Sequence, residues 1–544
     1  MSLSFNPETF NLGAGLANWA VVMAILAVVS FVTAVAVSLL ALGFAGPWQV
    51  LVHIVGGVQD LFGTSLRRTL ALAQLTFREA LRRKTLWVFG VFAVLFLFAG
   101  WFLADVTVDA ELQVKNYVSF VLRTISWLIL PVALLLSCWG LPEDIKARSL
   151  HTVVTKPVRR HEVVLGRILG YSAIGALVLG VMSVVGYVWI NRQLPDAMQS
   201  QLTARVPVYG EITFLDNEGK PAAAGVNTGD EDMFRSFVEG NTKARAIWQF
   251  SKIDPAHLEG AGGRLVLESS FQAFRTYKGN IERQLLGQYT LVNEKKNLRV
   301  PLKAFEIREF HRNVYDVAEK NPSLQDSAGK PVAISDLLSE GQLQVETACL
   351  SSAQFLGMAR PDLFIRMPDR PFAASYFKSI ANIGLMMLMI VVLGVVSGSF
   401  LKGPVATILT FFIVIVGRLA HSFMEGLVTG KVDYHNATVH VEGAGPFGAL
   451  YRIITHLTPG VPFKDEFFFR VIDALDKMAL NVLWAIQHMF PNFSSFDTTE
   501  YTANAFDVPW GEALLPNLAM TLGYCLPWIL VGYFSLRLRE LESK

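Results

Sequence analysis

The residues whose types and spacing point most clearly to a task lie in one short polar stretch, residues 141–167. The stretch carries six basic residues against three acidic ones and lies between two long apolar runs. Short loops rich in Lys and Arg stay on the cytoplasmic side of a membrane. We therefore predict a cytoplasmic loop, and its candidate functional residues are Glu143, Asp144, Arg148, Lys156, Pro157, Arg159, Arg160 and Glu162.

The local order of residues in this loop predicts two short helices at the inner membrane surface. Pro142, followed by Glu143 and Asp144, is typical of the first turn of a helix, where Pro lacks a needless donor and carboxylates meet the positive end of the dipole. Pro157 ends that helix or opens a second one, which leads into the next span.

Three segments of the loop carry a resemblance to a known family. They are Arg148-Ser149-Leu150, the run from Thr155 to Arg160, and Val164-Leu165-Gly166-Arg167. Together they resemble the cytoplasmic loop of ABC-2 type permeases, the membrane subunits of ABC transporters. The resemblance implies that the loop docks onto a separate ATPase subunit. The alternative from charge alone is a positive-inside loop without a partner.

The segment before the first core span, residues 64–84, predicts an amphipathic helix. Its apolar residues recur three and four apart and form one face: Leu66, Leu70, Ala73, Phe77 and Leu81. A basic helix with one apolar stripe lies flat at the inner membrane surface. The segment also resembles the elbow helix of ABC-2 permeases, although an ordinary juxtamembrane anchor fits the same position. Its candidate residues are Arg78, Glu79, Arg82 and Arg83, and Glu79 can pair with Arg83.

Composition places the chain among integral membrane proteins. Of its 544 residues, 52% are hydrophobic and only 17% are charged, and the mean hydropathy is +0.40. Soluble domains carry about 25% charged residues. The net charge of +2 gives no general attraction to nucleic acid. The three cysteines are scattered, and no cluster of Cys and His predicts a metal site.

The order of apolar and polar segments predicts a polytopic α-helical membrane protein with six core spans, and these spans resemble the six-helix core of ABC-2 type permeases. An extra N-terminal span precedes the core, and the bacterial inner membrane is the expected location. The predicted parts are an extra span and linker (1–63), the elbow helix (64–84), core spans one to three (85–190), an extracytoplasmic domain (191–373), a transmembrane hairpin (374–427), a second extracytoplasmic segment with surface helices (428–510), and a last span with a cytoplasmic tail (511–544).

The large polar insertion predicts a mostly β, sandwich-like domain. Segments 205–214, 264–268 and 285–292 have the composition of short strands, and Gly, Asn and Asp clusters separate them. Helical pieces are expected at 232–239 and 334–340. In the second polar segment, residues 465–488 have apolar residues at helical spacing and predict a surface helix.

A second candidate site lies late in the span that begins at Pro404. Arg418, His421 and Glu425 are three and four residues apart and share one helix face. Ionisable residues at membrane depth are costly and often functional. One interpretation is a polar translocation or gating site. The other is a helix end that emerges into water, with Arg418 snorkelling to lipid phosphate or pairing with Glu425.

Motifs for chemistry within this chain are absent from the sequence. It contains no phosphate-binding G-x-x-x-x-G-K-[ST] loop, no H-E-x-x-H and no G-x-S-x-G. We therefore expect a permease that is not itself an enzyme and binds no cofactor. The resemblance implies that ATP and Mg are bound by a partner ATPase, that the substrate is exported, and that two permease subunits form a homodimer or a heterodimer.

Two other hypotheses remain beside the permease. In the first, the spans only anchor an extracytoplasmic β domain that acts as a scaffold for partners. In the second, the chain is an ion-coupled transporter, a class that shows internal repeats and acidic midplane residues. We find neither feature in the sequence.

Overall fold

The computed structural model describes most of the chain, and every structural statement below concerns that part. It covers residues 10–82, 87–102, 110–146, 158–195, 199, 202–222, 225, 235–251, 253, 264–275, 285–308, 311–321, 323–326, 329–338, 341–429, 431–434, 437–440, 445–456 and 467–539. Contacts divide the chain into two compact units. The helical unit contains Pro7–Leu202, Pro371–Phe423 and Ile486–Lys544, and the β-rich unit contains Thr203–Arg370 and Met424–Ala485.

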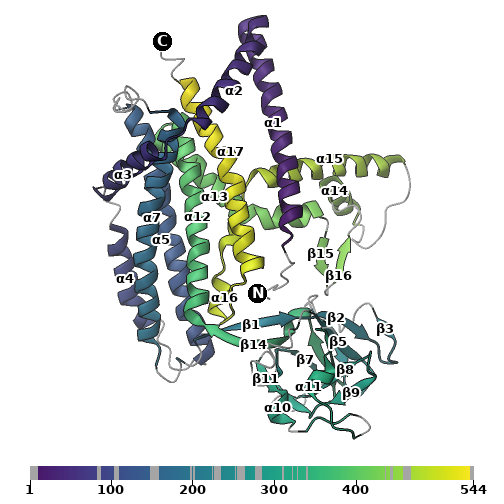
Figure 1. Cartoon of the computed structure of the whole chain (residues 1–544). Coiled ribbons are helices and arrows are strands. Elements are labelled where there is room, and N and C mark those ends of the chain that lie inside the picture. Colours follow the sequence, from purple (N-terminus) through teal and green to yellow (C-terminus); the bar gives the residue numbers. More distant parts are fainter. Residues whose placement is uncertain are drawn as a thin grey trace. The chain divides into compact units, whose positions relative to one another are not determined.

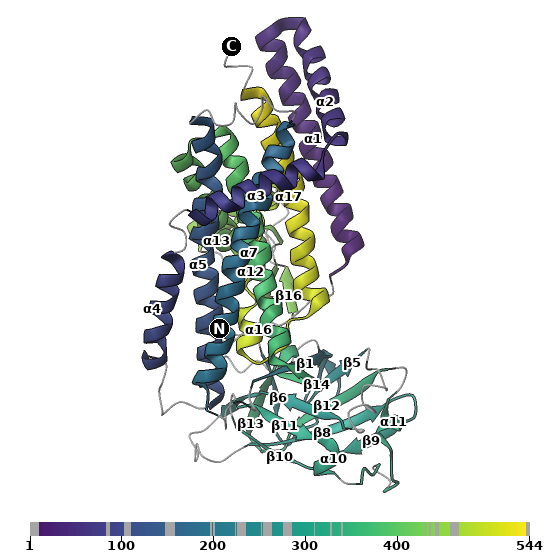
Figure 2. The same ribbon diagram turned by 60° about the vertical axis from the view of Figure 1, so that its left-hand side comes forward.

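The helical unit is built from long apolar helices that pack along one another (Figures 1 and 2). Five helices in the described residues are long and apolar enough to cross a membrane. They belong to α1 (Leu12–Leu42), α5 (Ala110–Lys146), α7 (Arg160–Gln193), α12 (Phe372–Phe400) and α17 (Leu515–Arg539).

The expected count of six plus one spans is not confirmed, because two of the predicted spans border residues outside the described part. The described part of α4, Trp87–Phe102, has 16 residues, and residues 83–86 and 103–109 on either side are not described. Helix α13 covers Gly403–Thr429, and the apolar stretch found within its described side chains is Gly403–Leu419.

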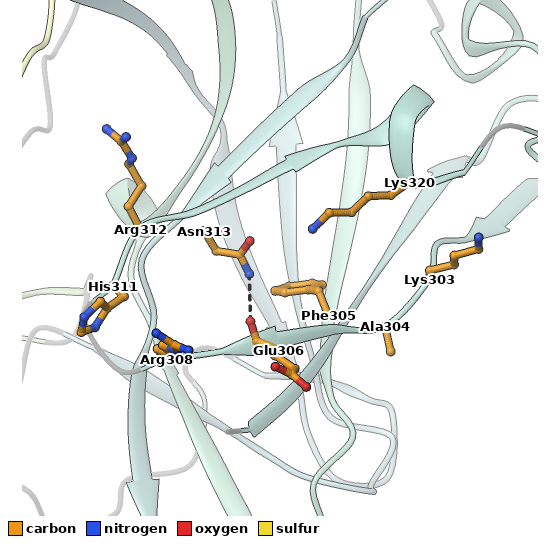
Figure 3. A pocket seen from close by; sticks show the side chains of 9 residues that line it. All are labelled: Lys303, Ala304, Phe305, Glu306, Arg308, His311, Arg312, Asn313 and Lys320. Carbon is orange, nitrogen blue, oxygen red and sulfur yellow. Dashed lines mark hydrogen bonds between the residues drawn. The ribbon is translucent and has the colours of Figure 1, made fainter. Parts of the chain in front are cut away.

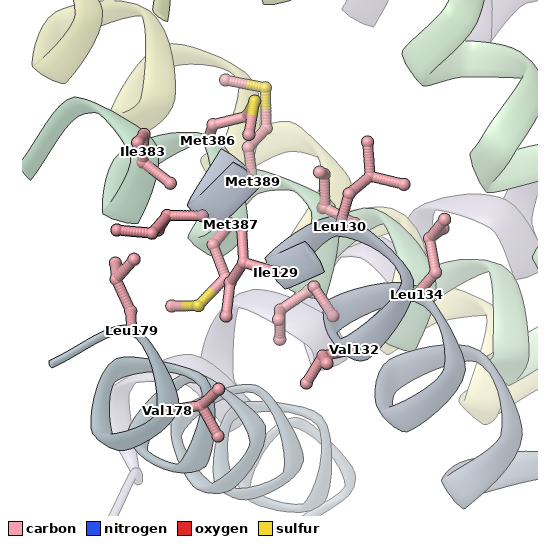
Figure 4. Packing of buried hydrophobic residues seen from close by; sticks show 14 of the residues in the cluster. Ile129, Leu130, Val132, Leu134, Val178, Leu179, Ile383, Met386, Met387 and Met389 are labelled. Carbon is pink, nitrogen blue, oxygen red and sulfur yellow. The ribbon is translucent and has the colours of Figure 1, made fainter. Parts of the chain in front are cut away.

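The centre of the helical unit is a close-packed apolar cluster formed by α5, α7 and α12. Figure 4 shows side chains from all three helices meeting there, among them Ile129, Val178 and Met387. Glycines allow the close approach. A Cβ atom at Gly175 of α7 would overlap the side chain of Met387 in α12, and one at Gly398 of α12 would lie 3.1 Å from Cδ of Pro142 in α5. Small residues at contacts are how helices pack in membranes.

Pro142 does not begin a helix, so this prediction was wrong. It lies inside α5, as does Pro131, and Glu143 and Asp144 belong to the last turns of the same helix. The helix continues through Pro142 because packing against its neighbours outweighs the lost backbone bond. Residues 147–157, including Pro157, lie outside the described part.

Helix α3 (Leu66–Arg82) occupies the predicted elbow segment, but its buried face differs from the predicted apolar stripe. The buried residues are Thr69, Thr76 and Ala80, whereas Leu66 and Leu70 are 78% and 60% exposed. The face with the small residues Thr69, Thr76 and Ala80 packs on α7, and the exposed side chains of Leu66 and Leu70 remain free to contact lipid. Before it, η1 (Gly43–Ala45) and α2 (Gly46–Phe62) occupy most of the segment expected to be a linker.

The last part of the helical unit was expected to be an extracytoplasmic segment. It contains η4 (Phe493–Phe496), α16 (Thr499–Ala503) and the π-helical turn η5 (Trp510–Leu514). Phe493 and Phe496 are buried in the same apolar core as α5 and α12. This short segment therefore packs against the spanning helices, and its extracytoplasmic position stays a prediction.

The β-rich unit consists of antiparallel sheets, as the composition predicted. The largest has the order β10-β8-β12-β5-β2-β3, with β9 also paired to β8, and the others are β1-β14-β6-β11, β4-β13-β7 and β15-β16. The strands are β1 (Thr203–Tyr209), β2 (Glu211–Leu215), β3 (Pro221–Ala222), β4 (Ser236–Glu239), β5 (Arg245–Phe250), β6 (Val266–Ser269), β7 (Gln272–Arg275), β8 (Leu285–Asn293), β9 (Leu298–Pro301), β10 (Phe305–Ile307), β11 (Asn313–Asp316), β12 (Leu343–Cys349), β13 (Gln354–Met358), β14 (Leu363–Pro371), β15 (Lys431–Tyr434) and β16 (Ala437–His440).

One apolar core joins the larger sheets of this unit. It contains Trp248 of β5, Leu267 of β6, Tyr289 of β8 and Ile365 of β14, all fully buried. The helix expected at 232–239 is wrong, because Ser236–Glu239 forms strand β4 and pairs with β13. Its apolar residues gain more from pairing in a buried sheet than from a short isolated helix.

Short helices complete the β-rich unit. Helix α10 (Val317–Lys320) follows β11, and α11 (Ile334–Leu337) falls in the segment where a helical piece was expected. A single 3-10 turn, η3, covers Arg360–Asp362. The second polar segment contains α14 (Pro446–Thr455) and α15 (Phe467–Met489), and α15 matches the surface helix expected at 465–488.

The close contact of α3 with α7 gives a direct test of the packing. A Cβ atom at Gly170 would lie 2.5 Å from Cβ of Thr76 and 2.8 Å from the carbonyl oxygen of Ala73. We expect Gly170→Ala to lower the free energy of unfolding by about 1–3 kcal/mol, because the overlap forces the helices apart. Thermal unfolding of the purified protein in detergent measures the change.

Gly180 provides the matched control, because a Cβ atom there meets no atom within 4 Å. Gly180→Ala is on the same helix and should leave the unfolding temperature unchanged or raise it slightly. Equal effects of the two substitutions would contradict the close α3–α7 contact.

Candidate functional site

The predicted loop residues that the structure describes converge on one junction, and Glu162 is at its centre. Its carboxylate is fully buried and accepts hydrogen bonds from the backbone N–H of Ser65 at 2.8 Å and of Arg159 at 3.0 Å. The Arg68 guanidinium donates two more, at 2.9 and 3.2 Å. One carboxylate thus joins the start of α3 to the start of α7, where it also satisfies free backbone donors.

The neighbouring His161 strengthens the same contact. Its ring is buried, and Nε2 lies 2.8 Å from Oγ1 of Thr64, the residue just before Ser65. The ring of Tyr533 in α17 meets it edge-on at 5.9 Å between centroids. The two residues at the start of α7 therefore hold the chain that enters α3 and also touch the end of α17.

Arg167 ties three helices together one and a half turns farther along α7. Its guanidinium pairs with Glu79 of α3 at 2.8 Å and with Asp144 of α5. The Arg167 side chain is only 12% exposed, so the pair with Asp144 is largely shielded from water, whereas the Glu79 side chain is 36% exposed. Glu79 and Asp144 were predicted as site residues, whereas Arg167 itself was not among them.

Asp60 of α2 connects the N-terminal helices to the same junction. Its carboxylate accepts a hydrogen bond from the hydroxyl of Tyr533 at 2.7 Å, and its backbone oxygen accepts one from Arg159 at 2.7 Å. Arg160 donates to the backbone oxygen of Arg537 in α17 at 3.1 Å. Arg159 and Arg160, predicted to face a partner, thus make contacts inside the chain.

The remaining predicted residues fall into two groups. Arg78 and Arg82 are exposed on α3, on a face that does not pack on α7, and Glu143 lies at the end of α5. Arg83, Arg148, Lys156 and Pro157 lie outside the described residues. The docking surface expected on the loop stays a prediction.

The second candidate site contains a partner that sequence reasoning missed. Arg418 of α13 pairs with Asp497 at 3.2 Å, and its guanidinium carbon lies 5.5 Å from the ring centre of Trp127 in α5. Asp497 follows η4 and is distant in sequence. His421 and Glu425 lie on α13, but their side chains are outside the described part, so the predicted stripe stays untested.

A buried polar seam between α12 and the α16 region was not predicted. Lys378 of α12 is only 8% exposed and donates to both carboxylate oxygens of Asp507, at 2.7 and 2.8 Å, and to the backbone oxygen of Val508. Next to it, Ser379 and Thr502 hydroxyls lie 2.7 Å apart, and farther along Asn517 donates to Asn382 at 3.0 Å. A lone lysine in an apolar run is the signal that could have revealed it.

A comparison with protein-family models identifies the segment that contains Glu162 and Arg167 of the junction. Residues 70–217 match the model of the ABC-2 family transporter protein. The chain carries an ABC-2 family transporter domain. The matched segment includes most of α3 and all of α4, α5 and α7, and with them Glu79, Asp144, Glu162 and Arg167. The family inferred from the loop and elbow motifs is confirmed. No curated protein and no solved structure matches the chain.

The Lys378–Asp507 pair yields a quantitative prediction. Lys378→Met leaves a buried carboxylate without its counter-ion, which costs about 3–5 kcal/mol of folding free energy. Adding Asp507→Asn removes the unpaired charge, so the double variant should unfold at a higher temperature than Lys378→Met alone. Thermal unfolding of the two single variants and the double variant in detergent tests the coupling.

Lys402 is the control, because it is the exposed lysine between α12 and α13. Lys402→Met should change the unfolding temperature little. Strictly additive effects of the Lys378 and Asp507 substitutions would show that the buried pair does not couple α12 to the α16 region.

Proposed function

We propose that this chain is the membrane subunit of an ABC exporter in a bacterial inner membrane, driven by a separate ATPase subunit. ATP and Mg are bound and ATP is hydrolysed on that partner, and this chain has no enzymatic activity of its own. Two permease subunits, identical or different, line one path. The observation that supports the proposal best is the Glu162 junction. Glu162 lies within the ABC-2 domain, and its bonds to Ser65 and Arg68, which lie just before that domain, join α3 to α7.

The junction has the properties that a coupling element needs. A force applied near the loop between α5 and α7 reaches α7 through Glu162 and Arg167, and both side chains also hold α3. Arg167 further links this pair to the end of α5. Switching transitions move packed helices as blocks between two arrangements, so a push on the loop tilts α3, α5 and α7 together.

The contacts of Arg159 and Arg160 inside the chain reduce the set of residues proposed to bind the ATPase. Both guanidinium groups donate hydrogen bonds to backbone oxygens, Arg159 to α2 and Arg160 to α17. We therefore assign the contact with the partner to the other basic residues of the loop, Arg148 and Lys156. The exposed arginines of α3, Arg78 and Arg82, lie on the helix joined to the same junction.

The alternative is a membrane-anchored scaffold, and the independent core of the β-rich unit favours it. An anchor needs one or two spans. The five long apolar helices exceed that number, and their internal ion pairs join helices that an anchor has no need to join. Under the scaffold hypothesis, deletion of the β-rich unit abolishes all function while no ATPase is bound.

Copurification tests the permease directly. The wild-type chain, extracted in mild detergent, should carry a nucleotide-binding ATPase that mass spectrometry identifies. Arg148→Glu combined with Lys156→Glu should reduce the recovered ATPase at least tenfold, because two attractive charges become repulsive.

The matched control reverses two exposed lysines of the β-rich unit, Lys220→Glu and Lys243→Glu. It changes the net charge equally and should leave ATPase recovery unchanged. Absence of any ATPase from the wild-type preparation would contradict the permease and favour the scaffold.

A further inference from the structure

A cavity in the β-rich unit lies between the edge strands of its two larger sheets. It measures about 480 Å³ and is formed by β10, β11 and α10 with the turns beside them (Figure 3). This size falls within the range of about 300–1,000 Å³ that is typical of small-ligand sites. All of its lining residues come from one chain segment, 303–320, so the cavity belongs to this unit alone.

The frame of the cavity is fixed by aromatic packing and hydrogen bonds. The Phe305 ring stacks on Tyr289 with 4.4 Å between centroids and meets Tyr315 edge-on at 5.5 Å. The Tyr315 hydroxyl donates to the backbone oxygen of Lys303 at 2.9 Å, and the Asn321 side chain accepts from the backbone N–H of Lys303 at 3.1 Å. Burial raises the pKa of Tyr315, so this donor keeps its proton at neutral pH.

The side chains around the cavity are mostly cationic. Lys303, Arg308, Arg312 and Lys320 line it together with one carboxylate, that of Glu306, and His311 adds a ring nitrogen. Figure 3 shows them arranged around Phe305. Lys320 places its ammonium 4.4 Å from the centre of the Tyr315 ring, a contact that orients the cation without neutralising it.

The charge is only partly balanced by neighbours in the described residues. Arg312 lies 3.8 Å from Glu268, but that buried carboxylate also pairs with Arg205 and with Arg366. One carboxylate is thus shared by three guanidinium groups. Neither Lys303 nor Lys320 has an ion pair with a carboxylate in the described part of the chain. The cavity therefore carries a local excess of positive charge in a chain whose net charge is only +2.

We propose that this cavity binds a ligand through a phosphate group with more than one negative charge. Arginine and lysine side chains that line one cavity supply several charged N–H donors, and such donors match the oxygens of a phosphate better than those of a single carboxylate. The phosphate belongs either to a free small molecule or to a lipid headgroup. The site lies outside the matched ABC-2 segment and does not depend on the proposed transport function.

Calorimetric titration of the full chain in an uncharged detergent tests the site. Two probes distinguish the sources of the phosphate: inorganic pyrophosphate for a free ligand, and short-chain dihexanoyl phosphatidic acid, whose phosphate monoester can carry two negative charges, for a lipid headgroup. We expect saturable binding of at least one probe at low salt. Raising the salt should weaken it, because the cavity is open to solvent. The double variant Lys303→Gln, Lys320→Gln should weaken it at least tenfold.

The control variant is Lys220→Gln with Lys243→Gln, which removes the same charge from exposed positions elsewhere in the β-rich unit. Binding unchanged in the control and weakened in the cavity variant establishes the site, and the probe that binds identifies the source. Equal weakening in both variants shows diffuse attraction and overturns the proposal. So does the absence of saturable binding for both probes. Circular dichroism of each variant checks that the β-rich unit is folded.

Discussion

The packing of the helical unit depends on one buried carboxylate, that of Glu162, whose oxygens accept hydrogen bonds from several donors. Burying a carboxylate is costly unless hydrogen bonds and a counter-ion replace its water. Glu162 meets that condition with two backbone N–H groups and the Arg68 guanidinium. Because these donors come from the starts of two different helices, α3 cannot leave α7 without exposing a charge inside the protein. The requirement to satisfy one carboxylate thus fixes the position of the whole elbow helix.

Other contacts at the junction hold further helices to the α3–α7 pair. Gly166 and Gly170 bring α7 within contact of α3, Arg167 adds α5, and Asp60 with Tyr533 adds α2 and α17. Helix α1 is held separately, where the Trp19 indole donates to the backbone oxygen of Gly523 in α17 at 2.9 Å. Both N-terminal helices lie outside the matched ABC-2 segment, and of the two it is α2 that is hydrogen-bonded to the junction, through Asp60.

The sequence predicted the parts of the fold that depend on local pattern. Long apolar runs, the periodicity of α3 and α15, and the strand composition of 205–214 and 285–292 all correspond to elements of the expected type. Pro142 misled because proline favours helix starts, whereas here the α12 surface at Gly398 packs against it within a continuous helix. Residues 236–239 form a strand because β13, more than a hundred positions later, pairs with them.

The candidate site was predictable in composition but not in contacts. Glu162, Asp144 and Glu79 were predicted as site residues because they are charged residues close to the ends of long apolar runs in the sequence. It could not show that Arg159 and Arg160 turn inward, because their acceptors are backbone oxygens of α2 and α17. Lys378 was overlooked because it sits alone in an apolar run, and its partner Asp507 is 129 positions away. Contacts between distant segments depend on tertiary packing, and the periodicity of apolar residues along the sequence carries no information about that packing.

Under the proposed function, α3 and α7 move as one body when a partner ATPase binds ATP. Spin labels at Gln74 of α3 and Ala173 of α7, both exposed, report the distance within that body, and labels at Gln74 and Lys402 report its distance to α12. The three native cysteines are buried. In the purified complex with its ATPase, the account predicts that ATP leaves the first distance narrow and unchanged and shifts the second. A first distance that broadens or shifts with ATP would contradict it.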